Sequence, residues 1–372
     1  MKTKITHLTS AHPRYDTRIF IKMCSSLAKK ENYKVNIVVA DGLGDETKNS
    51  VSIVDVGAKT GGRISRMTKT VKKVFEKAKE LNSDIYHLHD PELIPIGLKL
   101  KKLGKKVIFD AHEDLPKQIL GKHYLGNFTK KVLSKSIEIY EKISLKKFDY
   151  IITATPYIRD KFLKINKNSC DINNFPILDE LLSDVKYSYR KNQVCYIGVL
   201  AEVRGIKEIV KSMEYCVDTN LVIAGSFFDN NIEKEVKNYK GWKKVDFKGF
   251  VGRDEIKNIL DSSKVGLVTL HPIINYLDAL PVKMFEYMAA GLPVISSDIK
   301  LWKDIVEETN CGICVNPREP KEIADAIKYI IDNPKEAEQM GMNGKKAVIE
   351  KYNWGIEERK LFKLYSDMVN NL

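Results

Sequence analysis

The sequence of 372 residues contains no uninterrupted apolar run of about 18 residues, the length that a membrane-spanning helix requires. Residues 1–5 lead directly into a strand pattern and lack the apolar stretch and cleavage site of a signal peptide. The six cysteines are scattered, and only Cys311 and Cys314 have a spacing that suggests a metal site. No second pair or histidine lies near them, so we interpret them as small residues around a strand. Reduced thiols without an export signal predict a cytoplasmic protein.

Two motifs of nucleotide chemistry are also missing. Neither half of the chain contains the Gly-x-Gly-x-x-Gly fingerprint of dinucleotide-binding proteins. No Asp-x-Asp motif lies in a loop that suggests a divalent metal. We therefore expect no metal and no other cofactor, and the fold has to be predicted from the order of its elements.

The positive charge is concentrated in one half of the chain. Residues 1–178 hold 34 Lys and Arg against 19 Asp and Glu, whereas residues 179–372 hold 28 against 30. The segment 63–79 predicts a basic amphipathic helix whose apolar stripe packs on a sheet. Such asymmetry is typical of proteins that bind nucleic acid, an anionic membrane surface or phosphorylated substrates. Basic and aromatic residues are not interleaved and no nucleic-acid motif is present, so we favour the membrane surface.

Short apolar runs alternate with amphipathic stretches along the whole chain, a rhythm that predicts an α/β protein with parallel sheets. The expected strands are Lys4–Leu8, Lys34–Val39, Val51–Val56, Ile85–Leu88, Lys106–Asp110, Tyr150–Thr153, Gln193–Gly198, Thr219–Ala224, Val245–Lys248, Val265–Leu270, Pro293–Ser296 and Gly312–Val315. The length and a break at residues 173–176 predict two Rossmann-like domains, 1–180 and 181–354, facing each other across a cleft. A last helix, 355–372, caps its own domain or crosses to the first.

The most informative segment is 278–295, where a loop leads to a helix and the helix to a strand. Pro281 suits the first turn of this helix, and Gly291 suits its end. The free N–H groups of a helix start favour an anion such as a diphosphate. Lys283 is unfavourable near that helix start unless an anion is bound, and Glu286 is placed to accept hydrogen bonds from sugar hydroxyls. An ordinary surface helix with a mixed-charge face would also fit this pattern.

The run from Pro281 to Ile295, Pro-Val-Lys-Met-Phe-Glu-Tyr-Met-Ala-Ala-Gly-Leu-Pro-Val-Ile, resembles the donor-binding helix of glycosyltransferase family 4. It is most similar to the subgroup found in bacterial polysaccharide assembly. Further segments match that subgroup in the expected order, namely 12–18, 87–90, 110–113, 198–206, 222–225, 247–250 and 352–354. The resemblance covers nearly the whole chain and implies the GT-B fold.

For the second domain, the resemblance implies a site for a nucleoside diphosphate sugar. Glu286 matches the acid that binds the ribose hydroxyls, and Asp278 stands where the family has a longer glutamate. The family's cationic pair is reduced to Arg204, because Val199 occupies the other position, and Lys283 is the candidate that compensates. The donor set also includes Pro281, Val282 and the loop Gly249, Phe250 and Val251, whose backbone holds the base in similar proteins.

For the first domain, the resemblance implies that His112 lies near the donor sugar and, with Arg204 and Lys283, belongs to the catalytic set. The remaining candidates, expected near the acceptor or the cleft, are Arg14, Asp16, His89, Asp90 and Glu113. Asp16 also suits the N-cap of the first helix.

The resulting hypothesis is a retaining glycosyltransferase. It would move a sugar, with UDP as the commoner carrier, to a hydroxyl of a glycan or lipid-linked acceptor in bacterial surface polysaccharide synthesis. The family's reaction is a same-face displacement, in which preorganised cations stabilise the leaving diphosphate. Partners would be the nucleotide sugar, the acceptor and an anionic membrane surface, with no nucleic acid. Two alternatives remain open: a sugar-nucleotide 2-epimerase of the same fold, and a basic nucleic-acid-binding protein.

Overall fold

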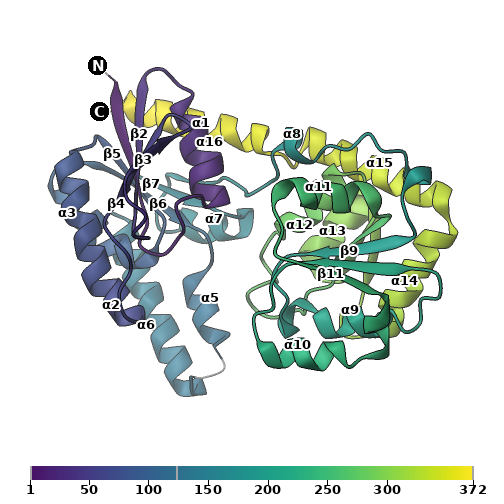
Figure 1. The fold of residues 1–372 in the computed structure, drawn as a ribbon. Helices are drawn as coiled ribbons and strands as arrows, with labels where there is room; N and C mark the ends of the chain where they lie inside the picture. The colour runs from purple at the N-terminus through teal and green to yellow at the C-terminus, as the bar shows by residue number, and fades with distance from the viewer. Residues whose placement is uncertain (1, 123–124, 371–372) are drawn as a thin grey trace. The chain divides into compact units, whose positions relative to one another are not determined.

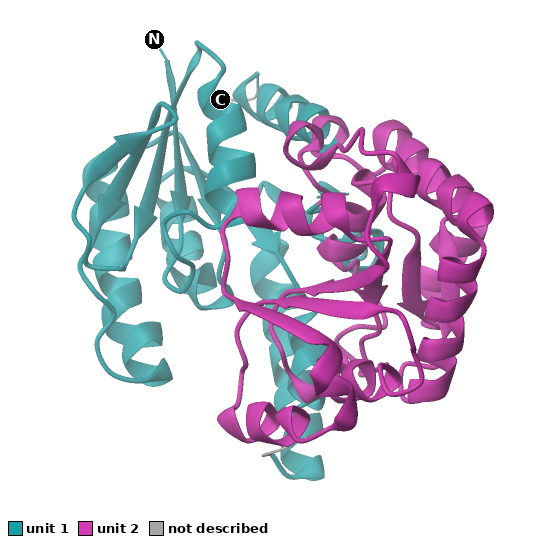
Figure 2. Ribbon diagram, turned by 45° about the vertical axis from the view of Figure 1, so that its right-hand side comes forward, with its two compact units in different colours: residues 1–174, 357–372 teal, residues 175–356 magenta. Residues whose placement is uncertain are grey.

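The computed structural model describes residues 2–122 and 125–370 and shows an α/β protein (Figure 1). The chain forms two compact units, residues 1–174 with 357–372 and residues 175–356 (Figure 2). The sequence placed the first boundary at residue 180, whereas residues 175–180 belong to unit 2. The reason is that Phe175 packs in the core of unit 2, its ring centroid 4.7 Å from that of Phe285. The chain returns to unit 1 within the last helix, α16 (Trp354–Val369).

Unit 1 is built on an eight-stranded sheet with the order β3-β4-β2-β1-β5-β6-β7-β8. All neighbours are parallel except β3 and β4. The strands are β1 (Thr3–Leu8), β2 (Tyr33–Val39), β3 (Glu46–Lys48), β4 (Val51–Asp55), β5 (Ile85–Leu88), β6 (Lys106–Ala111), β7 (Tyr150–Thr153) and β8 (Ser169–Asp171). The sequence missed only the edge strands β3 and β8, which have three residues each and no continuous apolar run.

The helices of unit 1 connect successive strands. They are η1 (Thr17–Cys24), α1 (Ser25–Ala28), α2 (Arg63–Ser65), η2 (Arg66–Thr70), α3 (Val71–Leu81), η3 (Pro91–Leu93), α4 (Ile94–Lys102), α5 (Leu115–Leu120), α6 (Asn127–Leu145) and α7 (Pro156–Leu163). The predicted basic helix 63–79 is present as α2, η2 and α3. Its apolar stripe is buried at Val71, Val74 and Ala78 only, because Ile64 and Met67 are exposed. Within the described residues, no helix combines the length and apolar composition needed to cross a bilayer.

Unit 2 contains a six-stranded parallel sheet with the order β11-β10-β9-β12-β13-β14. Its strands are β9 (Gln193–Ile197), β10 (Asn220–Ala224), β11 (Val245–Gly249), β12 (Val265–Val268), β13 (Val294–Ser297) and β14 (Gly312–Val315). Side chains of β9 alternate between two separate cores, Cys195 on one face and Val194 and Tyr196 on the other. The sheet is therefore buried on both faces, as parallel sheets require.

Helices lie on both faces of this sheet (Figure 1), and their buried side chains belong to both cores. Those of unit 2 are α8 (Leu178–Leu181), η4 (Tyr187–Tyr189), η5 (Glu202–Arg204), α9 (Ile206–Ser212), α10 (Asn230–Lys237), η6 (Lys240–Lys244), α11 (Arg253–Ser262), α12 (Val282–Ala289), α13 (Lys300–Thr309), α14 (Pro320–Asp332) and α15 (Pro334–Glu350). Helix α12 packs on the face that carries Cys195, and α9 and α14 pack on the opposite face.

The strand order of each unit reverses at its centre, between β1 and β5 in unit 1 and between β9 and β12 in unit 2. In open parallel sheets, ligands bind beside the carboxyl ends of the strands at this reversal. The residues at these positions are His89 after β5 in unit 1 and Gly198 after β9 in unit 2. The topology therefore points to one site in each unit.

Candidate functional site

Helix α12 begins beside the strand reversal of unit 2. Pro281 was predicted in the first turn, but it lies just before the helix because its ψ of 114° is extended. The helix starts at Val282, and Gly291, with φ of +71°, follows its end in the left-handed conformation that glycine tolerates. The preceding loop is fixed by Trp302, whose indole Nε1 donates to the carbonyl of Ala279 at 2.6 Å.

Lys283 is buried in the first turn of α12, with 9% of its surface exposed. Its Nζ lies 3.7 Å from the ring centroid of Tyr196 and, among the described residues, has no hydrogen-bond partner. Burial lowers the pKa of Lys283 well below 10.5, and nearby Arg204 lowers it further, against the opposing effect of Glu286. A buried ammonium without a partner is costly, so this position is suited to an anion that is not part of the chain.

Gly198, directly after β9, faces the two cations. Its φ is +132°, and a Cβ built there would lie 3.1 Å from Lys283 Nζ and 3.8 Å from Arg204 Nη1. The end of the neighbouring strand β10 lies close to Gly198, because a Cβ on Gly225 would lie 1.9 Å from the carbonyl oxygen of Gly198. Both strand ends therefore need glycine, and the glycine at position 198 keeps a side chain away from Lys283 and Arg204.

Glu286 lies one turn after Lys283 and is held by Arg253 at the start of α11. The Nη1 of Arg253 donates to Glu286 Oε1 at 2.8 Å, and its Nη2 donates to Glu180 at 2.8 Å. Asp278 is partly buried in the loop before α12. At the end of β11, Gly249 has φ of +67°, Phe250 is 86% exposed and Val251 packs against the core. The structure thus brings Lys283 and Arg204 together at Gly198 and links Glu286 to Arg253, two residues after Val251.

The strand reversal of unit 1 carries a cluster of five of the seven histidines of the chain. His7 on β1 and His87 on β5 are neighbours in register, and His7 Nδ1 lies 2.8 Å from His89 Nε2. Tyr365 of α16 closes one end, with its hydroxyl 2.9 Å from His87 Nδ1. His12 and His112 stand at the other end, with ring centroids 5.1 Å apart. Burial lowers the pKa of His89 to about 4, so this imidazole is neutral near pH 7.

Asp110, at the end of β6, organises the cluster. Its carboxylate accepts two hydrogen bonds from Arg18, at 2.9 and 2.7 Å, and lies 3.1 Å from His112 Nε2 and 3.2 Å from His89 Nδ1. Burial alone would raise the pKa of Asp110, but Arg18 and His112 hold it well below 3.8. The carboxylate fixes the ring of His112, while this histidine remains part-exposed.

Other candidates in unit 1 take different positions. Asp90 accepts from the hydroxyl of Thr9 at 2.8 Å and the N–H of Ser10 at 2.7 Å. Its neighbour His89 has no exposed side-chain surface, so it does not reach an acceptor. Its ring lies against the carboxylate of Asp110 instead. Glu113 is exposed and bonds Gln118.

Arg14, which was expected near the acceptor or the cleft, is held by carboxylates of its own chain. Arg14 is 5% exposed, because it makes a two-pronged ion pair with Asp41, at 2.8 and 2.7 Å, and lies 3.6 Å from Glu46. Asp16 caps η1 by accepting from the N–H groups of Arg18 and Ile19, each at 2.9 Å. These residues stabilise the loop after β1.

Comparisons with known proteins identify the family of this chain. The family model "Glycosyltransferase Family 4" matches residues 18–172, and "Glycosyl transferases group 1" matches residues 183–347. The chain belongs to glycosyltransferase family 4. It is therefore a glycosyltransferase of the GT-B fold, as the sequence predicted.

Individual family 4 relatives are distant. An uncharacterized glycosyltransferase of Methanocaldococcus jannaschii is 24% identical over 291 residues, 73% of this chain and 72% of that protein. Among solved structures, sucrose-phosphate synthase of Thermosynechococcus elongatus has a TM-score of 0.80 at 18% identity and covers all of both chains. HepE of Anabaena, solved with UDP-glucose, has a TM-score of 0.74 at 14% identity, covering 98% of this chain and 99% of that one. At these identities, the structures show a shared fold.

Several residues of this family 4 site were missed from the sequence. Tyr196 beneath Lys283 reads as an ordinary strand residue, and Arg253 is 33 positions from the Glu286 that it holds. Arg18 lies 92 positions from Asp110. A signal was available for the histidine cluster, because His87 interrupts the otherwise apolar strand Ile85–Leu88 and His89 follows it directly.

Proposed function

We infer that this glycosyltransferase transfers a sugar from a UDP-sugar, with retention of configuration, to a hydroxyl of a glycan or lipid-linked acceptor. We assign this reaction to the synthesis of a bacterial surface polysaccharide on an anionic membrane. The observation that carries the proposal is the buried, unpartnered ammonium of Lys283 beside Arg204 at the strand reversal of unit 2. Structural neighbours solved with UDP or UDP-glucose support the choice of carrier.

The diphosphate would occupy the start of α12. Two cations, Lys283 and Arg204, approach Gly198, and the first N–H groups of the helix point to the same end. Lys283 and Arg204 would offset the charge that develops on the departing diphosphate, which is the main electrostatic task of the reaction. Glu286, oriented by Arg253, would accept hydrogen bonds from the ribose.

The base would lie at the end of β11. Gly249 and Val251 offer backbone groups, and the exposed ring of Phe250 provides an apolar surface beside them. In the reaction, the leaving diphosphate takes the proton of the acceptor hydroxyl, the new glycosidic bond forms on the face that the diphosphate leaves, and UDP is released. No divalent metal takes part in this scheme, so we expect activity to survive EDTA.

The primary test is a thermal-shift titration with UDP, GDP and UMP, because a ligand that binds the native state raises its melting temperature. We expect UDP to raise it more than UMP, since the second phosphate reaches the two cations. An equal shift for UDP and UMP would contradict the diphosphate site. UDP release from UDP-glucose or UDP-N-acetylglucosamine, measured with and without added glycans, then separates transfer from epimerisation. Release that never depends on an acceptor would favour the epimerase.

A further inference from the structure

Two cations of unit 2 converge on one glycine, and like charges at short range repel each other. A Cβ on Gly198 would lie 3.1 Å from Lys283 Nζ and 3.8 Å from Arg204 Nη1. Burial lowers the pKa of Lys283, and the charge of Arg204 lowers it further. In the absence of a ligand, a group of the chain therefore has to hold both side chains at the glycine.

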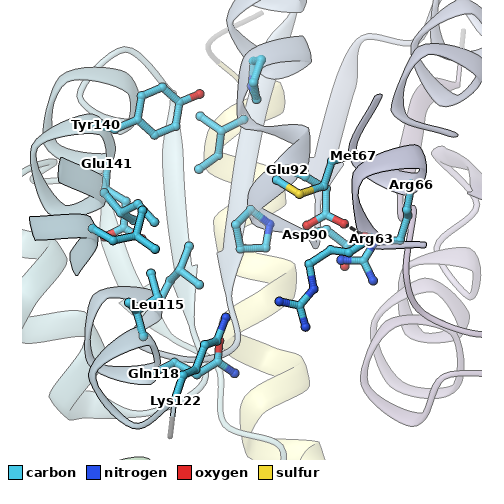
Figure 3. A pocket seen from close by; sticks show the side chains of 16 residues that line it. Arg63, Arg66, Met67, Asp90, Glu92, Leu115, Gln118, Lys122, Tyr140 and Glu141 are labelled. Atoms are coloured by element: carbon cyan, nitrogen blue, oxygen red, sulfur yellow. Dashed lines mark ion pairs between the residues drawn. The ribbon is translucent and has the colours of Figure 1, made fainter. Parts of the chain in front are cut away.

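In unit 1, the chain meets a similar need with a carboxylate. Arg66 pairs with Glu92 at 2.8 Å beside a pocket of about 730 Å³ (Figure 3). A carboxylate between Lys283 and Arg204 would neutralise them and would compete with the diphosphate that the proposed function requires. The proposed donor site therefore calls for a group that stabilises cations and carries no charge of its own.

The aromatic ring of Tyr196, near the carboxyl end of β9, has the properties of such a group. Its side chain is fully buried, and Lys283 Nζ lies 3.7 Å from the centroid of its ring. The face of an aromatic ring is electron-rich and attracts a cation, most strongly where water is excluded. The ring therefore stabilises the ammonium without neutralising it.

The hydroxyl of Tyr196 faces the second cation. It donates to the carbonyl of Val199 at 3.0 Å, which leaves the lone pairs of its oxygen free to accept. Burial raises the pKa of Tyr196, and the charge of Arg204 partly opposes this increase, so the guanidinium lies near the hydroxyl oxygen. The end of β9 has a separate support, because the N–H of Ile197 donates to the hydroxyl of Tyr287 at 2.9 Å.

A single buried side chain thus meets both cations. We propose that Tyr196 is a positioning residue of the donor site, whose ring holds Lys283 and whose hydroxyl holds Arg204 at Gly198 until the diphosphate binds. This inference rests on the proposed function and adds to it a residue that acts through both cations. The ring and the hydroxyl can be tested separately, because the ammonium can lose its proton near neutral pH when buried, whereas the guanidinium stays charged.

The ring is tested by calorimetric titration of the full chain with UDP and UMP. Tyr196→Met fills much of the space but removes the ring face, so we expect it to weaken UDP binding about tenfold or more and to reduce the preference for UDP over UMP. Tyr196→Phe keeps the ring and should retain most of this preference. Tyr187→Met is the matched control, because Tyr187 is a buried tyrosine of the same hydrophobic core, and it should leave the preference unchanged.

Proton uptake separates positioning from a purely structural role. Besides Arg204, the charged or titratable groups that act on Lys283 are Glu286 and Cys195, and both raise its pKa. Loss of the ring removes a stabilisation of the ammonium and should lower this pKa further. At a pH where the unmodified protein takes up less than one proton per UDP, Tyr196→Met should therefore take up more than Tyr196→Phe. Titrations in two buffers of different ionisation enthalpy measure this difference, which a packing defect alone would not produce.

The hydroxyl is tested by a double-mutant cycle of Tyr196→Phe and Arg204→Met, which can be measured even if Tyr196→Met does not fold. Tyr196→Phe should weaken UDP binding severalfold on its own and should have no further effect after Arg204→Met. The inference is overturned if these two effects add, if Tyr196→Met keeps the full preference for UDP, or if Tyr187→Met reduces that preference equally. An unmodified protein that binds UDP no better than UMP rejects the proposed function instead.

Discussion

Replacement of Lys283 by methionine should make the protein more stable and a weaker binder of UDP. The ammonium is buried, lies over the ring of Tyr196 and has no hydrogen-bond partner among the described residues. An unsatisfied buried polar group costs about 1–3 kcal/mol, and more when it is charged. Methionine keeps most of the chain's apolar volume, so Lys283→Met should raise the free energy of unfolding by about 1–3 kcal/mol.

The effect on binding should have the opposite sign. A hydrogen bond to a charged group contributes about 1.5–3 kcal/mol, which corresponds to a loss of UDP affinity of about 10- to 150-fold. Lys300→Met is the matched control, because the Lys300 side chain is 88% exposed and pairs only with Asp304 on the surface. Urea unfolding gives the stability, and calorimetric titration with UDP gives the affinity. A Lys283→Met protein that is less stable and binds UDP as tightly as the Lys300→Met control would refute the reasoning.

The pKa of Lys283 adds a second readout to the same experiment. Burial lowers this pKa, so between the lowered value and 10.5 the unfolded chain binds a proton that the native chain does not. The free energy of unfolding should therefore rise with pH across that window, and Lys283→Met should remove this rise. A bound diphosphate raises the pKa again, so UDP binding should take up protons at a pH between the lowered value and 10.5. Titrations in two buffers of different ionisation enthalpy measure this uptake, which should be smaller in Lys283→Met.

Three further predictions concern the supporting residues. Arg253→Ala should raise the KM for the UDP-sugar severalfold through a misplaced Glu286, while melting temperature changes little, because the ion pair is half-exposed; equal KM values would contradict this. Arg18→Met should lower the free energy of unfolding by about 3–5 kcal/mol, measured in urea, since it removes the guanidinium that pairs with the buried Asp110 carboxylate. Arg18→Met combined with Asp110→Asn should recover part of the loss. Burial alone would lower the pKa of His12, but Asp16 and Asp90 raise it above 6.5, so its stabilisation is present below pH 6.5 and is lost as pH rises through the raised value. His12→Gln should therefore lower the melting temperature more at pH 6 than at pH 9.

The sequence predicted the fold through features that are local. Apolar runs marked all strands except β3 and β8, and the segment from Pro281 to Ile295 marked the helix start at which we propose the donor site. What it could not predict are pairings between distant positions. Arg14 was expected to be available for a ligand, yet Asp41, 27 positions away, binds it, because β1 and β2 are neighbours in the sheet. Lys283 and Tyr196 are likewise 87 positions apart, so no single segment contains their contact.

The two strand reversals differ in whether the cations beside them are already neutralised by carboxylates of the chain. In unit 1, the cations next to the reversal are neutralised within the chain, Arg14 by Asp41 and Arg18 by Asp110. In unit 2, no carboxylate within ion-pair distance of Lys283 or Arg204 is found among the described residues. A phosphate group gains most where cations have not already been neutralised. The chain's own pairing of charges therefore supports the proposal that the diphosphate binds in unit 2 and not at the strand reversal of unit 1.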